Sequence, residues 1–169
     1  MSDTGPSESN AALIADFYRA FQRRDAAAMG ACYAPAVRFS DPVFGDLEGD
    51  RAIAMWEMLC VRAEDLRIEF RDVSADDRIG RAHWDAWYTF TTTGRPVHNS
   101  IDATFEFADG HIVEHTDHFD VHRWATQALG LPGRVFGGLP PFKRKLRTTA
   151  LKGLDAYLSR ATPPTADGA

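Results

Sequence analysis

The sequence is poor in cysteine and has no long apolar run. Its two cysteines, Cys32 and Cys60, lie in predicted helices among apolar neighbours, which disfavours a disulfide framework and predicts buried, reduced thiols. No apolar stretch approaches the roughly 20 residues with which a helix spans a bilayer. The first ten residues, MSDTGPSESN, contain neither a basic nor an apolar segment, so no signal peptide is indicated. We therefore expect a cytoplasmic protein.

An excess of positive charge is also missing. Lysine and arginine number 19 against 24 aspartates and glutamates, and the formal net charge is −5. Nucleic-acid binding needs a basic surface, so we expect no nucleic-acid partner. The basic residues are unevenly placed, because residues 141–160 contain six of them and one acidic residue. With 169 residues and 44% apolar side chains, the chain can form one domain with a sizeable core.

Apolar spacing predicts three helices in the first part of the chain. The first spans residues 10–24, with Ser9 or Asn10 as its cap and apolar residues at helical spacing. The second spans residues 26–33 and stops before a proline, which cannot continue a helix. A short strand follows at residues 37–39, and Asp50 opens the third helix.

The remaining pattern is typical of consecutive antiparallel strands, at residues 66–73, 81–92, 97–107 and 111–119. Asp109-Gly110 is a strong hairpin signal before the last of them. Helices followed by a strand meander indicate an α+β fold. We expect three N-terminal helices packed on a strongly curved antiparallel sheet, a cone-shaped α+β barrel around an apolar cavity. Such cavities usually bind a ligand.

The chain divides into four predicted parts. Residues 1–9 and 161–169 are polar tails that we expect to be disordered, and residues 10–130 form the domain. Residues 131–160 contain a Gly–Pro hinge and an additional basic amphipathic helix. This helix can pack on its own domain or on a partner subunit, or it can lie on an anionic membrane surface. Its apolar stripe is Phe142, Leu146, Ala150, Leu154 and Leu158.

Three segments resemble the nuclear transport factor 2-like superfamily, which includes ketosteroid isomerases, SnoaL-like polyketide cyclases, limonene epoxide hydrolases and scytalone dehydratases. They are the first helix leading into Asp25, the segment FSDPVFG at 39–45, and GHIVEH at 110–115 with the following Phe119-Asp120 and QALG at 127–130. The last is similar to the closing signature of SnoaL-like sequences. The resemblance covers roughly residues 10–130 and implies the cone fold with a pocket.

Asp41 is the sharpest catalytic candidate. Ketosteroid isomerases place a proton-shuttling aspartate just before a proline, near a glycine, at the end of the first strand, and Asp41-Pro42 with Gly45 matches that position. Burial at the rim of an apolar pocket would raise the pKa of this carboxyl and make it a usable general base. The alternative is an aspartate that caps the backbone amides of a turn.

The other isomerase residues match less well. The position of their first-helix tyrosine falls on Phe17, with Tyr18 one residue later, which is a rotation of about 100° on a helix. Asp102 resembles the second isomerase aspartate, but if Phe105 and Phe107 face the core, strict alternation turns Asp102 outward. Only a β-bulge would change this. We therefore do not expect ketosteroid isomerase activity.

Four histidines, His111, His115, His118 and His122, fall close together in the sequence. Their spacing would suit a metal if the segment were helical. The segment is predicted as a strand, in which His111 and His115 share one face while His118 takes the other. We therefore expect no metal site.

His115 and Asp117 share the strand face that we expect to line the cavity, together with Val113 and Phe119. Two polar groups in an apolar pocket can orient a ligand or relay a proton, or they can form a structural hydrogen-bonded pair. The remaining predicted lining is apolar or aromatic: Phe17, Tyr18, Phe39, Trp56, Trp84, Tyr88, Phe90, Ala103 and Phe105.

The sequence thus predicts a pocket for a small apolar molecule and cofactor-free acid–base chemistry of the isomerase, cyclase, dehydratase or epoxide hydrolase type. Asp41 would be the base, with His115 and Asp117 assisting. One alternative is a non-catalytic binder of a hydrophobic ligand or lipid. The other is an interaction module that forms a homodimer through the outer sheet face, where Trp87 and His83 lie. An open cavity with a raised Asp41 pKa would favour the enzyme, and a cone filled by its own side chains would favour the interaction module.

Overall fold

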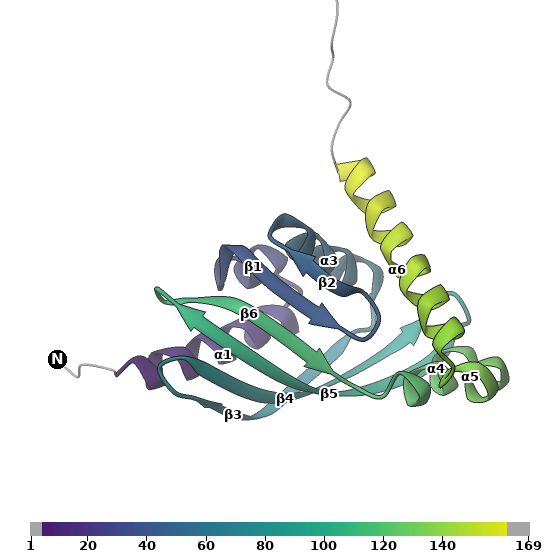
Figure 1. Cartoon of the computed structure of the whole chain (residues 1–169), viewed down its shortest axis with the longest axis horizontal. Helices are drawn as coiled ribbons and strands as arrows, with labels where there is room; N and C mark the ends of the chain where they lie inside the picture. The colour runs from purple at the N-terminus through teal and green to yellow at the C-terminus, as the bar shows by residue number, and fades with distance from the viewer. Residues whose placement is uncertain (1–4, 162–169) are drawn as a thin grey trace, which may run out of the picture.

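The computed structural model describes residues 5–161 and shows one curved sheet with helices on its concave side (Figure 1). The helices are α1 (Pro6–Gln22), α2 (Ala26–Ala31), α3 (Asp50–Arg62), α4 (Val121–Leu129), α5 (Leu131–Phe136) and α6 (Pro140–Ala161). The strands are β1 (Tyr33–Asp41), β2 (Gly45–Glu48), β3 (Arg67–Ala75), β4 (Ile79–Phe90), β5 (Arg95–Ala108) and β6 (His111–His118). The predicted α+β class is confirmed.

The six strands form a single sheet in the order β2-β1-β6-β5-β4-β3. All neighbours are antiparallel except β1 and β6, which run parallel. The sheet is therefore mixed, and it stays open, with β2 and β3 at its edges. The parallel pair arises because β1 and β6 are far apart in the chain, so no hairpin turn dictates their relative direction.

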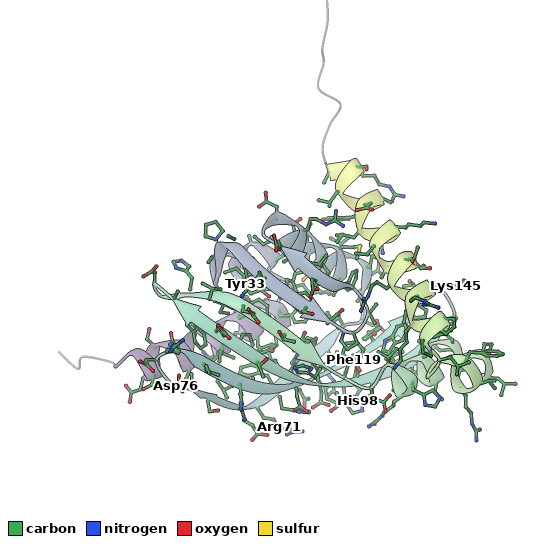
Figure 2. The ribbon with its side chains drawn as sticks, viewed as in Figure 1. Tyr33, Arg71, Asp76, His98, Phe119 and Lys145 are labelled. Carbon is green, nitrogen blue, oxygen red and sulfur yellow. The ribbon has the colours of Figure 1, made fainter. Side chains whose placement is uncertain are left out.

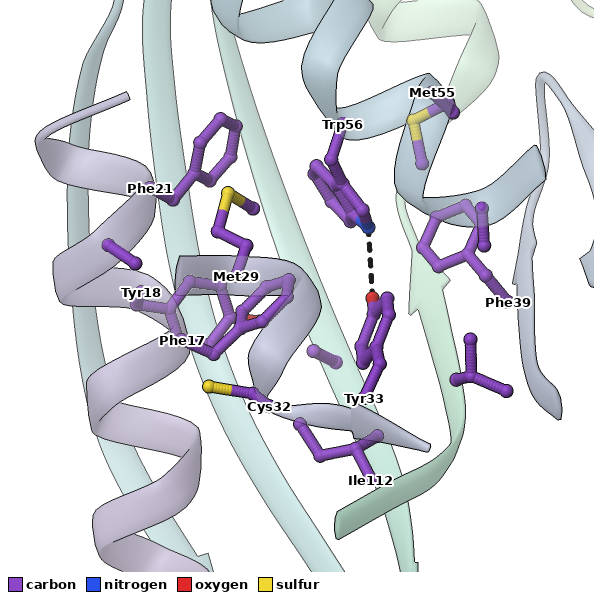
Figure 3. Packing of buried hydrophobic residues seen from close by; sticks show 14 of the residues in the cluster. Phe17, Tyr18, Phe21, Met29, Cys32, Tyr33, Phe39, Met55, Trp56 and Ile112 are labelled. Carbon is purple, nitrogen blue, oxygen red and sulfur yellow. Dashed lines mark hydrogen bonds between the residues drawn. The ribbon is translucent and has the colours of Figure 1, made fainter. Parts of the chain in front are cut away.

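The core lies between the sheet and the first three helices. The predicted stripe of α1 is buried, with Ile14, Phe17 and Tyr18 each 0% exposed. In β4 the predicted alternation also holds, because Ala82, Trp84 and Ala86 are buried while the residues between them face outward. Figure 3 shows how the rings from α1, α3 and β1 fill the space above the sheet.

Several predicted boundaries differ from the structure. Residues 6–9, predicted as tail, belong to α1, whereas the predictions for residues 1–4 and 162–169 lie outside the described part of the chain. Tyr33 was predicted to end the second helix but begins β1. The residue before Pro35 must be extended, so the strand starts two residues before the proline.

The C-terminal helix α6 packs its apolar stripe on its own domain, which is one of the three arrangements that the sequence allowed. Phe142 and Leu146 contact a small cluster around Trp124, while Leu154 is 0% exposed in the main core. At the level of β2, a Cβ on Gly45 would lie 3.1 Å from Nε of Arg147. The strands β1, β4 and β6 run in the same direction, so their C-terminal ends lie at the same end of the cone. The helix α6 crosses this end and reaches α3 (Figure 1). Among the described helices, none is long and apolar enough to cross a membrane.

Candidate functional site

Asp41 closes β1 and has two roles in the structure. Its Oδ1 accepts hydrogen bonds from the amides of Val43, at 2.9 Å, and Phe44, so it is the turn-capping aspartate of the simpler interpretation. Burial also raises the pKa of Asp41 to about 7, although the Phe44 hydrogen bond opposes the shift, and the nearby Asp117 charge raises it further. The carboxyl therefore exchanges its proton near neutral pH, as a general base must.

His115 and Asp117 form the centre of a buried hydrogen-bond chain. His115 is 0% exposed, and its Nε2 lies 3.0 Å from Oδ1 of Asp117. Its Nδ1 lies 2.7 Å from the hydroxyl of Tyr33, which accepts a hydrogen bond of 2.9 Å from Nε1 of Trp56 (Figure 3). The indole of Trp84 donates to Asp117 at 3.2 Å. Every donor and acceptor in this hydrogen-bond chain has a partner when His115 is neutral, with its Nε2 proton toward Asp117 and its Nδ1 accepting from Tyr33.

Tyr33 was missed at the sequence level, because a tyrosine at the end of a predicted helix carries no site signal. Pro35 was the available clue, since it requires extended backbone before it. An inward side chain at the start of a strand then follows from strand alternation. The structure brings this hydroxyl between Trp56 and His115.

Tyr18 presents the one unpaired polar atom of the site. Among the buried side-chain nitrogens and oxygens of residues 5–161, only its hydroxyl has no hydrogen-bond partner. Burial raises the pKa of Tyr18 well above its ordinary value, and the negative charge of Asp117 adds to the shift. Despite the one-residue offset from the isomerase pattern, Tyr18 points into the core. A free donor therefore lies within the electrostatic reach of Asp117.

The predicted lining residues pack against one another around this network. Phe105 lies 4.4 Å from the His115 ring, and Trp56 is stacked on it at 5.9 Å. Buried with them are Phe17, Tyr18, Phe39, Trp84 and Ala103. Tyr88 and Phe90 lie at one side, where both contact Trp124. In this closed arrangement the rings fill the cone.

Two hollows open on the surface of the described chain. One, of about 310 Å³, is lined by residues of β1, β2 and β6, mostly polar ones such as Arg38, Asp46 and Glu114, together with Phe39 and Leu47. The other, of about 380 Å³, includes Asp65 and Thr89. Neither is lined by Asp41, His115 or Asp117.

The remaining histidines do not join His115. His111 was predicted to share its face, which is wrong: Ile112 is 0% exposed and His111 is exposed. The cause is a register shift in β6, where Ile112 and Glu114 pair with consecutive residues of β5 and leave Val113 between them unpaired. His118 and His122 are exposed as well. Within residues 5–161, no group of three or more His, Cys, Asp and Glu side chains is placed to hold a metal ion.

The outer sheet face carries a second polar network. Nδ1 of His83 lies 2.7 Å from Oδ1 of Asp102, whose side chain is 79% exposed, so Asp102 faces outward as predicted. Asp85 lies between His83 and His98, at 3.4 and 2.8 Å. Trp87 stacks on the ring of His98 at 4.6 Å, and Arg67 covers Trp87 at 4.0 Å. In Figure 2, His98 and Arg71 mark this face, on the side of the sheet away from α3.

The protein has helices inside a curved open sheet and ionisable groups near the end of the cone. This combination places it in the class of small α+β cone domains. Residues 14–115 match the family model described as SnoaL-like domain, so the chain belongs to this family. The resemblance drawn from the sequence is confirmed. A search of curated proteins finds no match to the chain.

Solved structures show the same fold at low sequence identity. A candidate SnoaL-like polyketide cyclase from Jannaschia sp. CCS1 superposes with a TM-score of 0.65 at 16% identity, covering 78% of this chain and 97% of its own. A candidate polyketide cyclase from Xanthomonas campestris pv. campestris gives 0.63 at 22%, with 73% and 99% covered. An LEH-like epoxide hydrolase from M. tuberculosis gives 0.59 at 18%, with 76% and 96% covered.

Proposed function

We propose that the protein binds a small apolar molecule in its cone and carries out cofactor-free proton transfer on it. The observation that supports this most strongly is the pKa of about 7 at Asp41, next to Asp117 and its hydrogen-bond network. The similar structures described as polyketide cyclases and as an epoxide hydrolase favour isomerase, cyclase, dehydratase or hydrolase chemistry. We also propose that it acts in the cytoplasm, in keeping with two free, buried thiols.

In the proposed mechanism Asp41 is the base. The amides of Val43 and Phe44 hold its Oδ1, and the amide of Gly45 also favours the charged form. The ionised carboxylate takes a proton from the substrate. The unpaired hydroxyl of Tyr18 can donate a hydrogen bond to the oxygen on which negative charge develops. The His115–Asp117 pair fixes the surrounding polar groups and can relay the proton to another substrate atom. The proton that Asp41 takes from one substrate atom is delivered to another, so the carboxylate is regenerated and no redox step is required.

Access to this site requires movement, because the rings are close-packed and α6 crosses the end of the cone. The apolar stripe of α6 holds it against both clusters of buried residues. A substrate must therefore displace α6 or the adjacent rings before it reaches Asp41. Such closure would also exclude water from the proton transfer.

Native mass spectrometry of freshly purified protein, followed by a turnover panel with an apolar epoxide and a β,γ-unsaturated ketone, tests the proposal. We expect a bound apolar molecule and a turnover that Asp41→Asn reduces by at least about 100-fold, the usual contribution of a general base. Asp46→Asn, at an exposed position of the neighbouring strand β2, should leave turnover intact. Binding that persists with no turnover in either protein would indicate a non-catalytic binder. No binding and no effect of Asp41→Asn would refute the pocket.

The packing of the cone favours a second candidate, a homodimer formed through the outer sheet face. The face carries the stacked set of Arg67, Trp87 and His98, and the side chains of His83 and Asp85 are only 16% and 15% exposed. Sedimentation velocity tests this: Trp87→Glu should convert a dimer into a monomer, whereas Val61→Glu on α3 should not. A wild-type monomer at high concentration would exclude the candidate.

A further inference from the structure

An exposed apolar patch lies on α5 and the turn after it. Of the six large apolar side chains that are exposed within residues 5–161, four fall in nine consecutive residues. These four define the α5 patch: Leu131, 71% exposed; Val135, 58%; Phe136, 52%; and Leu139, 50%. In Figure 1, α5 lies at one end of the long axis of the molecule, so the patch is presented at a tip.

Glycines on the opposite side of α5 fix this outward orientation. A Cβ on Gly133 would lie 1.9 Å from the carbonyl oxygen of Ala125 in α4, and a Cβ on Gly137 would lie 2.9 Å from the Cβ of Ala125. Nε2 of His122 also lies 2.8 Å from the carbonyl oxygen of Arg134. Because α5 is attached to α4 along its glycine side, its large apolar side chains have no buried position to occupy.

The patch is surrounded by positive charge. Residues 131–147 contain Arg134, Lys143, Arg144, Lys145 and Arg147 and no acidic residue, although the whole chain carries −5. All five side chains are exposed, and none forms an ion pair with a carboxylate of the described chain. The amide of Lys143 donates to the carbonyl of Leu139 at 3.1 Å, which brings the basic start of α6, its first two turns, beside the patch. Lys145 is labelled at this end of α6 in Figure 2.

We propose that the α5 patch and the first two turns of α6 dock on an anionic lipid surface. Exposed apolar side chains can enter the headgroup boundary while adjacent Lys and Arg side chains attract anionic headgroups. A symmetric contact with a second copy would bring two sets of five cations together and is disfavoured. The apolar stripe of α6 is buried on its own domain, so the contact is made by the α5 end of the extension and does not require α6 to detach.

Vesicle cosedimentation of the full chain tests this, with vesicles of phosphatidylcholine alone and of phosphatidylcholine mixed with phosphatidylglycerol. We expect binding to the anionic vesicles only, weakened by high salt. Val135→Ser with Phe136→Ser should lower the affinity at least about tenfold, and so should charge reversal at Lys143, Arg144 and Lys145. Val61→Ser is the matched control, because Val61 is an equally exposed apolar residue (66%) on α3. Thermal melting checks that each variant is folded.

Three outcomes would overturn the proposal. The first is a lack of binding to anionic vesicles, and the second is equal binding to both vesicle types. The third is a wild-type protein that does not bind vesicles but is oligomeric in sedimentation velocity, and that loses this oligomer in the double serine variant. The patch would then hold a second copy of the chain. None of these depends on Asp41, so the result is independent of the proposed catalysis.

Discussion

Asp41 shows how one side chain can satisfy a turn and still titrate near neutral pH. Hydrogen bonds from the backbone amides of Val43, Phe44 and Gly45 favour its charged form, but burial and the nearby Asp117 charge oppose ionisation more strongly, so the pKa rises to about 7. Ionising a buried carboxyl costs free energy, and the folded protein tolerates this cost because the rest of the core holds Asp41 in place.

The raised pKa makes stability depend on pH in a definite direction. An unfolded aspartate ionises near pH ~3.9, whereas Asp41 in the folded protein keeps its proton until about pH 7. The folded state thus binds more protons between these values, and its stability falls as the pH rises through this window. Asp41→Asn removes this effect, so we expect it to be more stable than wild type at pH 8 by about 4 kcal/mol, at about 1.4 kcal/mol for each unit of the pKa shift, with the difference vanishing near pH 4.

Thermal melts across this pH range measure the effect, with Asp46→Asn as a control at an exposed carboxyl. A stability difference between Asp41→Asn and wild type that stays constant from pH 4 to pH 8 would show that Asp41 is not shifted.

Removal of two buried tyrosine hydroxyls should change the stability of the fold in opposite directions. The hydroxyl of Tyr18 has no partner, so Tyr18→Phe should stabilise the fold by about 1 kcal/mol. The hydroxyl of Tyr33 bridges Trp56 and His115, so Tyr33→Phe should cost about 2 kcal/mol by leaving both partners unsatisfied. Urea unfolding of the pair measures the difference. A Tyr18→Phe variant as destabilised as Tyr33→Phe would mean that Tyr18 has a partner in solution.

At the scale of elements, α5 depends on a close backbone approach to α4. A Cβ on Gly133 would overlap the Ala125 carbonyl oxygen, whereas a Cβ on Gly138 would lie 3.9 Å from the ring of His122. Gly133→Ala should therefore separate α5 from α4 and cost at least about 2 kcal/mol, while Gly138→Ala should be nearly neutral. Hydrogen exchange across residues 121–139 would locate the loss. Equal protection in both variants would contradict the packing of α5 on α4.

The strand β2, the register shift in β6 and the helix α5 were not predicted, because the local sequence did not distinguish them from a loop, a regular strand and a hinge. Gly45, which begins β2, and Gly49, which follows it, are typical of a loop. The residues between them alternate exposed and buried and pair with β1. The shift at Val113 leaves no mark in the sequence, since its position depends on how β5 and β6 meet. The helix α5 was missed because its glycines and proline are typical of a hinge.

At the scale of the whole molecule, α6 joins two groups of buried side chains. It contacts the cluster around Trp124 at its start and the main core at Leu154. Leu154→Ala should therefore cost about 3 kcal/mol and reduce hydrogen-exchange protection in both α3 and α4, whereas Leu139→Ala, at a half-exposed side chain, should change little. Loss of protection in α3 alone would mean that the two clusters unfold independently.

The sequence alone determined the features that depend on neighbouring residues. The α1 stripe follows from helical periodicity and the β4 faces from strand alternation. The hairpin follows from the Asp109-Gly110 pair, which favours a turn with positive φ, and both residues have positive φ in the structure, at 51° and 74°. Together with the motif at Asp41, these identified the fold and the family.

Only the tertiary structure decided the features that depend on contacts between distant segments. It set β1 parallel to β6, brought Tyr33 and Trp56 to His115, and filled the cone with its own aromatic rings. It also turned the apolar side chains of α5 outward, because the helix could approach α4 only along its glycines. The pKa of Asp41 belongs to the same group, because desolvation is a property of everything packed around a carboxyl and not of the residues beside it in the chain.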